Sequence, residues 1–212
     1  MSGQPTEDLW LFGYGSLIWK PPPHYDLRVP GYIEGYVRRF WQDHRGTPED
    51  PGRVATLIDR KLWETLTDHH ASAPPAVWGA AYRIPATHVP EVKEYLDIRE
   101  INGYSIQYTP FNQDMSATYQ TVHAAPDSEA GLPQAIQCLV YIGLPDNPQF
   151  LGPQDPQALA EHIVKSHGPS GENIDYLFQL ESALDGLSAE SGDEHVSDLA
   201  RRCREIQEQS KK

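Results

Sequence analysis

The chain contains few cysteines and few basic residues. Its two cysteines, Cys138 and Cys203, are far apart, and neither has a neighbour at metal-ligand spacing. Such usage argues against a disulfide framework and is typical of a reducing compartment. Lys and Arg total 17 against 30 Asp and Glu, which gives a formal net charge of -13. This balance argues against nucleic acid and anionic membrane as partners, because both require basic surface.

Long apolar runs are also missing. A membrane-spanning helix needs a run of roughly 18 apolar residues or more, and no segment of this sequence approaches that length. The first eight residues are polar and lack the apolar core of a secretory signal. The sequence therefore predicts a soluble protein of the cytoplasm.

Several motifs of catalysis and cofactor binding do not occur. None of the nine histidines shows the H-x-x-x-H spacing on a predicted helix, so we expect no metal site and interpret the histidines as surface residues and local hydrogen-bond partners. Ser16 does not lie in a nucleophile elbow, because Tyr14 and Ile18 stand where that motif requires glycine. The lysine-containing phosphate loop and the third glycine of a dinucleotide fingerprint are absent as well.

The order of the predicted elements indicates the fold class. Short segments rich in aromatic and β-branched residues dominate the first two thirds of the chain, and helical patterns dominate the last third. This order favours an α+β fold over alternating βαβ units. We predict one domain over residues 1–212, a small mixed β-barrel flanked by helices. The expected strands are 9–14, 32–41, 53–58, 77–84, 105–109, 118–122 and 135–142, and the expected helices are 89–100, 156–165, 173–187 and 194–209.

Three segments are predicted to lie at the surface. Residues 64–75 and 124–133 are interpreted as surface insertions. The C-terminal helix from about Glu194 is charged over most of its length, and we expect it to be a solvated packing helix and not a partner site.

The N-terminal strand ends abruptly in Gly13-Tyr14-Gly15-Ser16-Leu17. Two glycines so close together let the backbone turn sharply and approach a ligand without a Cβ in the way. Backbone N–H groups at such a strand end can form a concavity that binds an anion. The alternative is a tight turn after a buried strand.

Glu100 continues the apolar stripe of a predicted helix. Val92 and Leu96 precede it at steps of four residues, so its carboxylate is expected on the buried face. Both desolvation and the negative end of the helix dipole disfavour its charge, which would raise its pKa toward the range of a general acid or base. The alternative is a carboxylate paired with Arg99.

Two loops carry further candidates with alternatives. Arg45 or Arg53 can bind a substrate carboxylate through two hydrogen bonds, or their segment is only a stiff connection between strands. In the run 166–173 we expect Gly168 to end one helix and Ser170 or Asn173 to cap the next. The alternative is an anion held at the N-terminus of the second helix.

Taken together, the motifs resemble one known family. The chain is similar to the ChaC-type γ-glutamylcyclotransferases, and most to their glutathione-specific members, over about residues 9–180. The matching segments are GYGSLIWKP at 13–21, GYVRRFW at 35–41, DHRGT at 43–47, PGRVATL at 51–57, YLDIREINGY at 95–104, VYIG at 140–143 and GPSG at 168–171.

The resemblance implies an enzyme that cleaves glutathione to 5-oxoproline and cysteinylglycine. The α-amine of the substrate attacks its own γ-amide, so no metal, cofactor or covalent nucleophile is required. Glu100 is implied as the catalytic acid and base, and Glu91 matches a second carboxylate of the family. The expected substrate-binding residues are Tyr14, Gly15, Ser16, Leu17, Arg53, Glu91, Tyr104 and Tyr141.

Two other functions remain open at this stage. One is a cyclotransferase for other γ-glutamyl-amino acids or γ-glutamylamines, which differ only in the leaving group. The other is a non-catalytic regulator or binding protein. The sequence also leaves open whether the chain is a monomer or a homodimer.

Overall fold

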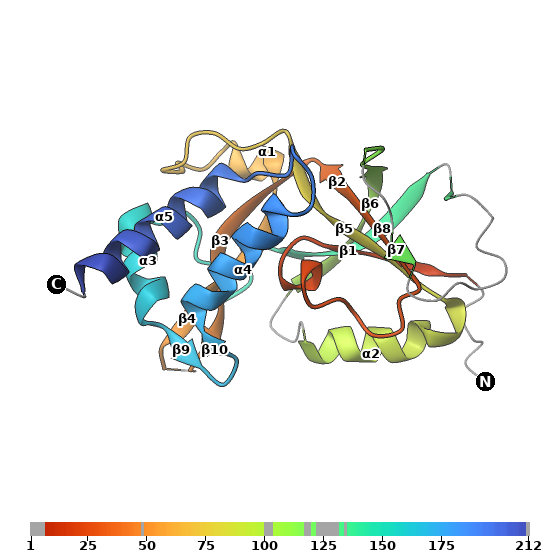
Figure 1. Cartoon of the computed structure of the whole chain (residues 1–212), viewed down its shortest axis with the longest axis horizontal. Helices are drawn as coiled ribbons and strands as arrows, with labels where there is room; N and C mark the ends of the chain where they lie inside the picture. Colours follow the sequence, from red (N-terminus) through yellow and green to blue (C-terminus); the bar gives the residue numbers. More distant parts are fainter. Residues whose placement is uncertain are drawn as a thin grey trace.

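Five strands close into a small barrel (Figure 1). The computed structural model describes residues 7–47, 49–99, 104–116, 120–121, 132–133 and 135–210. Its main sheet contains β1 (Leu9–Gly13), β2 (Leu27–Glu34), β5 (Ala76–Ile84), β6 (Tyr104–Gln113), β7 (Gln120–Thr121) and β8 (Ile136–Gly143). The strand order is β5-β1-β8-β6-β2-β7, and β2 also pairs with β5, which closes the barrel. Because β1 runs parallel to β8 and antiparallel to β5, the barrel is mixed, as predicted.

One face of the barrel is covered by α2 (Val89–Arg99) (Figure 1). Side chains of β1 alternate between two apolar clusters, as a strand requires. Trp10 and Phe12 belong to one cluster, and Leu11 belongs to the cluster that also contains Val92 and Leu96 of α2. Val92 and Leu96 are fully buried. The predicted apolar stripe of this helix is therefore confirmed over the part of it that the structure describes.

A long hairpin and three helices form the second half of the fold. The hairpin consists of β3 (Tyr36–Gly46) and β4 (Pro51–Asp59) and is followed by the short α1 (Arg60–Trp63). Figure 1 shows α3 (Pro156–Lys165), α4 (Asn173–Asp185) and α5 (Glu194–Gln209) gathered around the hairpin. None of the helices in the described part of the chain is long and apolar enough to cross a membrane.

The shorter elements connect these parts. They are the single 3-10 turns η1 (Ser16–Ile18) and η2 (Ala86–His88) and the two-residue strands β9 (His167–Gly168) and β10 (Gly171–Glu172).

Several strand boundaries differ from the prediction. β3 continues to Gly46, past the predicted end at Trp41, and β6 continues to Gln113, past the predicted end at Thr109. The segment predicted as one strand over 32–41 is divided at Gly35, whose φ of 85° lies in the left-handed region that glycine tolerates. The strand that ends there begins earlier, at Leu27, and includes Pro30, whose missing N–H obscures the pattern. Of the strand predicted over 118–122, the structure describes only Gln120 and Thr121, which form β7.

The C-terminal helix packs against its neighbours through one buried side and carries charge on the other, as expected of a solvated packing helix. Val196, Leu199 and Cys203 are buried against α3 and α4. His195 is buried as well, so it is not a surface residue as interpreted, although it is the expected kind of hydrogen-bond partner. The charged residues occupy the other side, where Arg201 pairs with Asp198 and Glu205. Charge therefore marks one side of this helix only.

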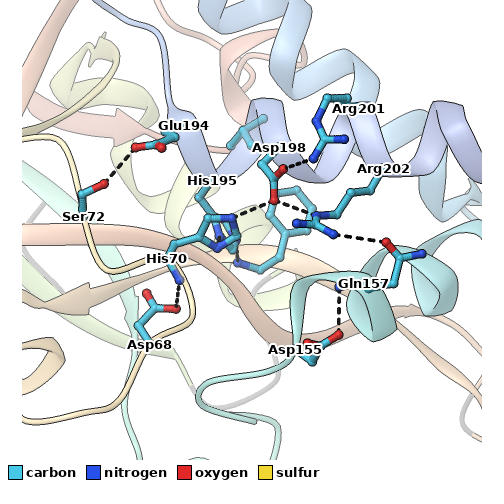
Figure 2. A network of polar contacts seen from close by, with 12 residues as sticks. Asp68, His70, Ser72, Asp155, Gln157, Glu194, His195, Asp198, Arg201 and Arg202 are labelled. Atoms are coloured by element: carbon cyan, nitrogen blue, oxygen red, sulfur yellow. Dashed lines mark hydrogen bonds and ion pairs between the residues drawn. The ribbon is translucent and has the colours of Figure 1, made fainter.

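A chain of hydrogen bonds links α5 to the hairpin and to the segment 64–75 (Figure 2). The backbone N–H of Phe40 donates to Nε2 of His195 at 3.0 Å. Nδ1 of His195 lies 3.0 Å from Nδ1 of His70, and Nε2 of His70 lies 3.0 Å from Asp198. Segment 64–75 does lie at the surface, but the carboxylate of Asp68 within it is nearly buried and pairs with Arg39 of β3. Segment 64–75 is therefore an insertion that is bonded to β3 through Asp68 and to α5 through His70.

Candidate active site

A cavity of about 320 Å³ lies at the end of β1, between the barrel and the helices. Its walls come from the segment after β1, from the β3–β4 hairpin, and from α2, β8 and α4. Four of the predicted substrate-binding residues, Tyr14, Gly15, Ser16 and Leu17, line it together, and Tyr141 of β8 faces them. Segments that are far apart in the sequence thus meet at the loop that the glycines predict.

Both glycines of this loop are required by close packing. A Cβ on Gly13 would lie 2.6 Å from Cβ of Leu17, because the chain folds back over the end of β1. A Cβ on Gly15 would lie 2.9 Å from the hydroxyl of Tyr176 of α4. Real Cβ atoms do not approach other atoms so closely, so any larger residue would displace the loop or the tyrosine.

Hydrogen bonds hold the loop in one conformation. The N–H of Ile18 donates to the carbonyl of Gly15 at 2.9 Å, and the N–H of Lys20 donates to that of Ser16 at 2.8 Å. The buried hydroxyl of Tyr82 of β5 donates to the carbonyl of Leu17 at 2.6 Å. Tyr82 lies 65 residues away in sequence, and nothing in the local pattern predicted this contact.

Aromatic side chains form much of the cavity wall. Tyr95 of α2, Tyr141 of β8 and Tyr176 of α4 line it. Tyr176 packs edge-on against Trp19 with 5.4 Å between ring centroids and against Phe40 with 5.8 Å. This packing fixes the ring of Tyr176 against the loop, and a wall of aromatic side chains with a few polar groups is typical of small-molecule sites.

Three polar residues of the lining were not predicted as site residues. They are Lys20, His44 of β3 and Ser170, which lies between β9 and β10. Gly168 was expected to end one helix and Ser170 or Asn173 to cap the next, yet α3 ends at Lys165 with Ser166 as its C-cap, and Glu172 is the N-cap of α4. All three lie within motifs that the family resemblance covers, so that resemblance was the available signal for them.

Arg53 does not line the cavity. Its guanidinium contacts Asp43 and the carbonyl of Pro51. Burial lowers the pKa of Arg53, although the nearby carboxylate of Asp43 acts in the opposite direction. The backbone of Arg53 exchanges two hydrogen bonds of 2.7 Å with the side chain of Asn173, which ties β4 to α4. The structure thus gives this arginine a framework position, and the side chain of Arg45 is outside what it describes.

Glu91 also lies away from the cavity, one helical turn before Tyr95 on the solvent side. Its carboxylate lies 2.9 Å from Nε2 of His24 and 3.9 Å from Nδ1 of His88. These three side chains, which the sequence did not group, have ligand-type atoms within 4.8 Å of one another. The two imidazole rings are parallel with centroids 4.3 Å apart, so their in-plane lone pairs cannot converge on one ion. The cluster is therefore a surface contact that joins the segment between η1 and β2 to η2 and α2. Binding of a metal ion would require the imidazole rings to turn.

The remaining two predicted residues cannot be placed. Glu100 lies outside the described residues, directly after the last described residue of α2. Tyr104 begins β6, but its side chain is outside what the structure describes. Their assignments stay predictions.

Comparison with known proteins identifies close relatives. The model of the family described as "ChaC-like protein" matches residues 9–206. A glutathione-specific gamma-glutamylcyclotransferase of Schizosaccharomyces pombe is 45% identical over 199 residues, covering 92% of each chain. The human glutathione-specific gamma-glutamylcyclotransferase 1 is 35% identical and is matched over 75% of its length by 89% of this chain.

A solved structure agrees with the fold. The glutathione-specific gamma-glutamyl cyclotransferase from yeast superimposes with a TM-score of 0.79 at 36% identity. The match covers 94% of this chain and 97% of that one. The barrel, the hairpin and the helical layer are thus an arrangement that this chain shares with a solved relative.

Proposed function

This chain belongs to the ChaC-like family, and we propose that it is a γ-glutamylcyclotransferase that converts glutathione to 5-oxoproline and cysteinylglycine. The observation that carries the proposal is the cavity over Tyr14–Leu17, the segment on which the substrate loop of the family falls. Relatives that match most of this chain are named for this activity. The cavity volume of about 320 Å³ lies within the range of small-molecule sites.

The reaction asks little chemistry of the protein. The α-amine of the glutamyl residue attacks its own γ-amide carbonyl, the ring closes, and the C–N bond to cysteine breaks. Nucleophile and electrophile belong to one molecule, and well-oriented attack of this kind reaches effective molarities of ~10⁵–10⁸ M. The main task of the cavity is then to hold the glutamyl chain in its folded, reactive conformation.

The loop supplies the first part of that task. The backbone N–H groups of Gly15–Leu17 hold either the glutamyl carboxylate or the developing oxyanion. Preorganised donors lower a barrier because they need no reorientation when charge develops. Support comes from the fixed geometry of this loop, in which Tyr82 anchors Leu17 and the packing of Tyr176 leaves no room for a side chain at Gly15.

Glu100 supplies the proton chemistry in this proposal. A carboxylate accepts a proton from the substrate ammonium and returns one to the leaving nitrogen, and a raised pKa would suit both steps. Its support is the apolar stripe of α2, which Glu100 continues in the sequence, and Tyr95 of the same helix, which lines the cavity.

The test is Glu100→Gln, which keeps the shape of the side chain but cannot carry the proton. We expect release of 5-oxoproline from glutathione to fall ~10²–10⁴-fold in kcat. Glu94→Gln, on an exposed position of the same helix, is the matched control and should retain wild-type activity. Near wild-type turnover by the Glu100 variant would refute its assigned role.

Substrate choice is tested with a panel. We expect the highest kcat/KM for glutathione, above γ-glutamylcysteine, γ-glutamylalanine and a γ-glutamylamine. A preference for one of the others would favour the broader cyclotransferase. Failure to cleave any of them would favour a non-catalytic binding protein.

We also place the enzyme in a reducing compartment such as the cytoplasm. Both cysteines are buried, free thiols. Burial raises the pKa of Cys203 to about 12, which makes the thiol inert.

A further inference from the structure

The substrate and the protein present an electrostatic problem. Glutathione carries two carboxylates and one ammonium group, whereas the protein has a formal net charge of -13. An acidic protein that binds an anion needs positive charge placed locally. The described residues that line the cavity include one lysine, Lys20, and no arginine. The one other basic side chain among them is that of His44.

Lys20 has a fixed backbone and an exposed side chain. Its N–H donates to the carbonyl of Ser16, within the substrate loop, at 2.8 Å. Trp19 before it packs on Tyr176, and the three residues after it are prolines, which restrict φ. The ammonium group makes no ion pair within the part of the chain that the structure describes. A lysine held in this way keeps its charge available at the mouth of the cavity.

The two ends of the substrate need different depths. The γ-amide must lie against the loop, where Gly15 and Leu17 are buried. Beyond that amide, cysteine and glycine extend by at most ~7 Å, so the glycine carboxylate lies toward the mouth. The exposed Lys20 lines the same cavity at that side.

We propose that the ammonium group of Lys20 binds the glycine carboxylate of glutathione and thereby sets the preference for this tripeptide. The inference rests on the function proposed above and adds a specificity-determining residue to it. The competing contact is the glutamyl carboxylate, which every γ-glutamyl compound carries. The two contacts differ in one property, because only the glycine carboxylate can be removed while the reacting end stays intact.

The experiment pairs a change in the enzyme with a change in the substrate. Lys20→Met and Lys20→Arg are assayed with glutathione and with its glycine monoethyl ester, which lacks the outer negative charge. Lys61→Met, an exposed lysine on α1 outside the cavity, is the control. Release of 5-oxoproline gives kcat and KM separately.

We expect Lys20→Met to lower kcat/KM for glutathione about 10-fold, mainly through a higher KM, as for loss of a hydrogen bond between charged groups. The same variant should change kcat/KM for the ester less than about 2-fold, and Lys20→Arg should retain most of the activity. The KM of the wild type for glutathione should also rise with salt, and that of Lys20→Met should rise less.

Two results would overturn the inference and leave the proposed function in place. One is an equal loss for glutathione and its ester, which would assign Lys20 to the reacting end. The other is no loss with either substrate. If instead the wild type forms no 5-oxoproline from glutathione, the proposed function itself fails.

Discussion

Polar groups serve opposite purposes in the cavity and in the hydrogen-bond network that links α5 to the β3–β4 hairpin. In the cavity, the glycine-containing loop, a lysine and several hydroxyl-bearing side chains surround open space. In the network, the ring nitrogens of His70 and His195 contact one another, a backbone N–H and a carboxylate, so that no nitrogen of either ring faces a cavity. The first arrangement is suited to a ligand, and the second is complete without one.

The network also has a defined direction. Because Phe40 donates to Nε2 of His195, a neutral His195 carries its proton on Nδ1 and donates it to Nδ1 of His70. His70 then carries its proton on Nε2 and donates it to Asp198. Two histidines and an aspartate resemble a catalytic relay in composition, yet here they hold a helix to a hairpin. Titratable residues in contact therefore identify a site only where they adjoin space for a substrate.

The largest effect on activity is expected from a substitution in the loop that lines the cavity. In Gly15→Ala the new Cβ would lie 2.9 Å from the hydroxyl of Tyr176, so the loop must shift. We expect kcat/KM for glutathione to fall ~10²-fold, the size typical of a misplacement near 1 Å.

Two further variants make this prediction specific. Gly192→Ala is the control, since nothing lies within 4 Å of a Cβ at that position. The double variant Gly15→Ala with Tyr176→Phe removes the hydroxyl that the new Cβ would meet, and it should recover activity relative to Gly15→Ala alone. If the double variant is no better, the contact with Tyr176 is not the reason for the glycine.

A smaller effect is expected from breaking the network. His195→Ala leaves the N–H of Phe40 without its acceptor and opens a cavity in a fully packed region. We expect the free energy of unfolding to drop by about 2–4 kcal/mol, measured by chemical denaturation. Activity per folded molecule should stay at the wild-type level.

The exposed His167 provides the control for this change. It is the first residue of β9, and His167→Ala should alter the free energy of unfolding by less than about 0.5 kcal/mol. A His195 variant that loses activity at unchanged stability would contradict the separation between the two regions.

The sequence predicted the parts that depend on local pattern. Spacing alone placed Val92 and Leu96 on the buried face of α2, because an amphipathic helix repeats every 3.6 residues. The two glycines also marked the loop correctly, since a sharp turn and close packing both require the absence of a Cβ.

The parts that depend on long-range contacts were not predictable in this way. His70 and His195 are 125 residues apart, and each lies in a segment whose composition indicates surface. Arg53 was a reasonable candidate for a substrate carboxylate, but Asp43 and Pro51 occupy its guanidinium. Periodicity reports whether a side chain is buried, whereas partner choice depends on how distant segments pack.

The smallest expected effect is a pH dependence that belongs to the network alone. Burial lowers the pKa of His195 well below its usual value, and the positive charges of Arg39 and Arg38 and the neighbouring His70 act in the same direction. In the unfolded chain His195 therefore binds a proton as the pH falls through about 6.5, whereas in the folded chain it stays neutral there. Stability from this group is fully present above about pH 6.5 and is lost as the pH falls below it, by at most about 1.4 kcal/mol per pH unit.

His195→Gln accepts from Phe40 but does not titrate, so its stability should fall less steeply between about pH 6.5 and 5. Equal slopes for the variant and the wild type would mean that His195 is not held neutral, and the contrast between a closed network and an open site would then lose its electrostatic basis.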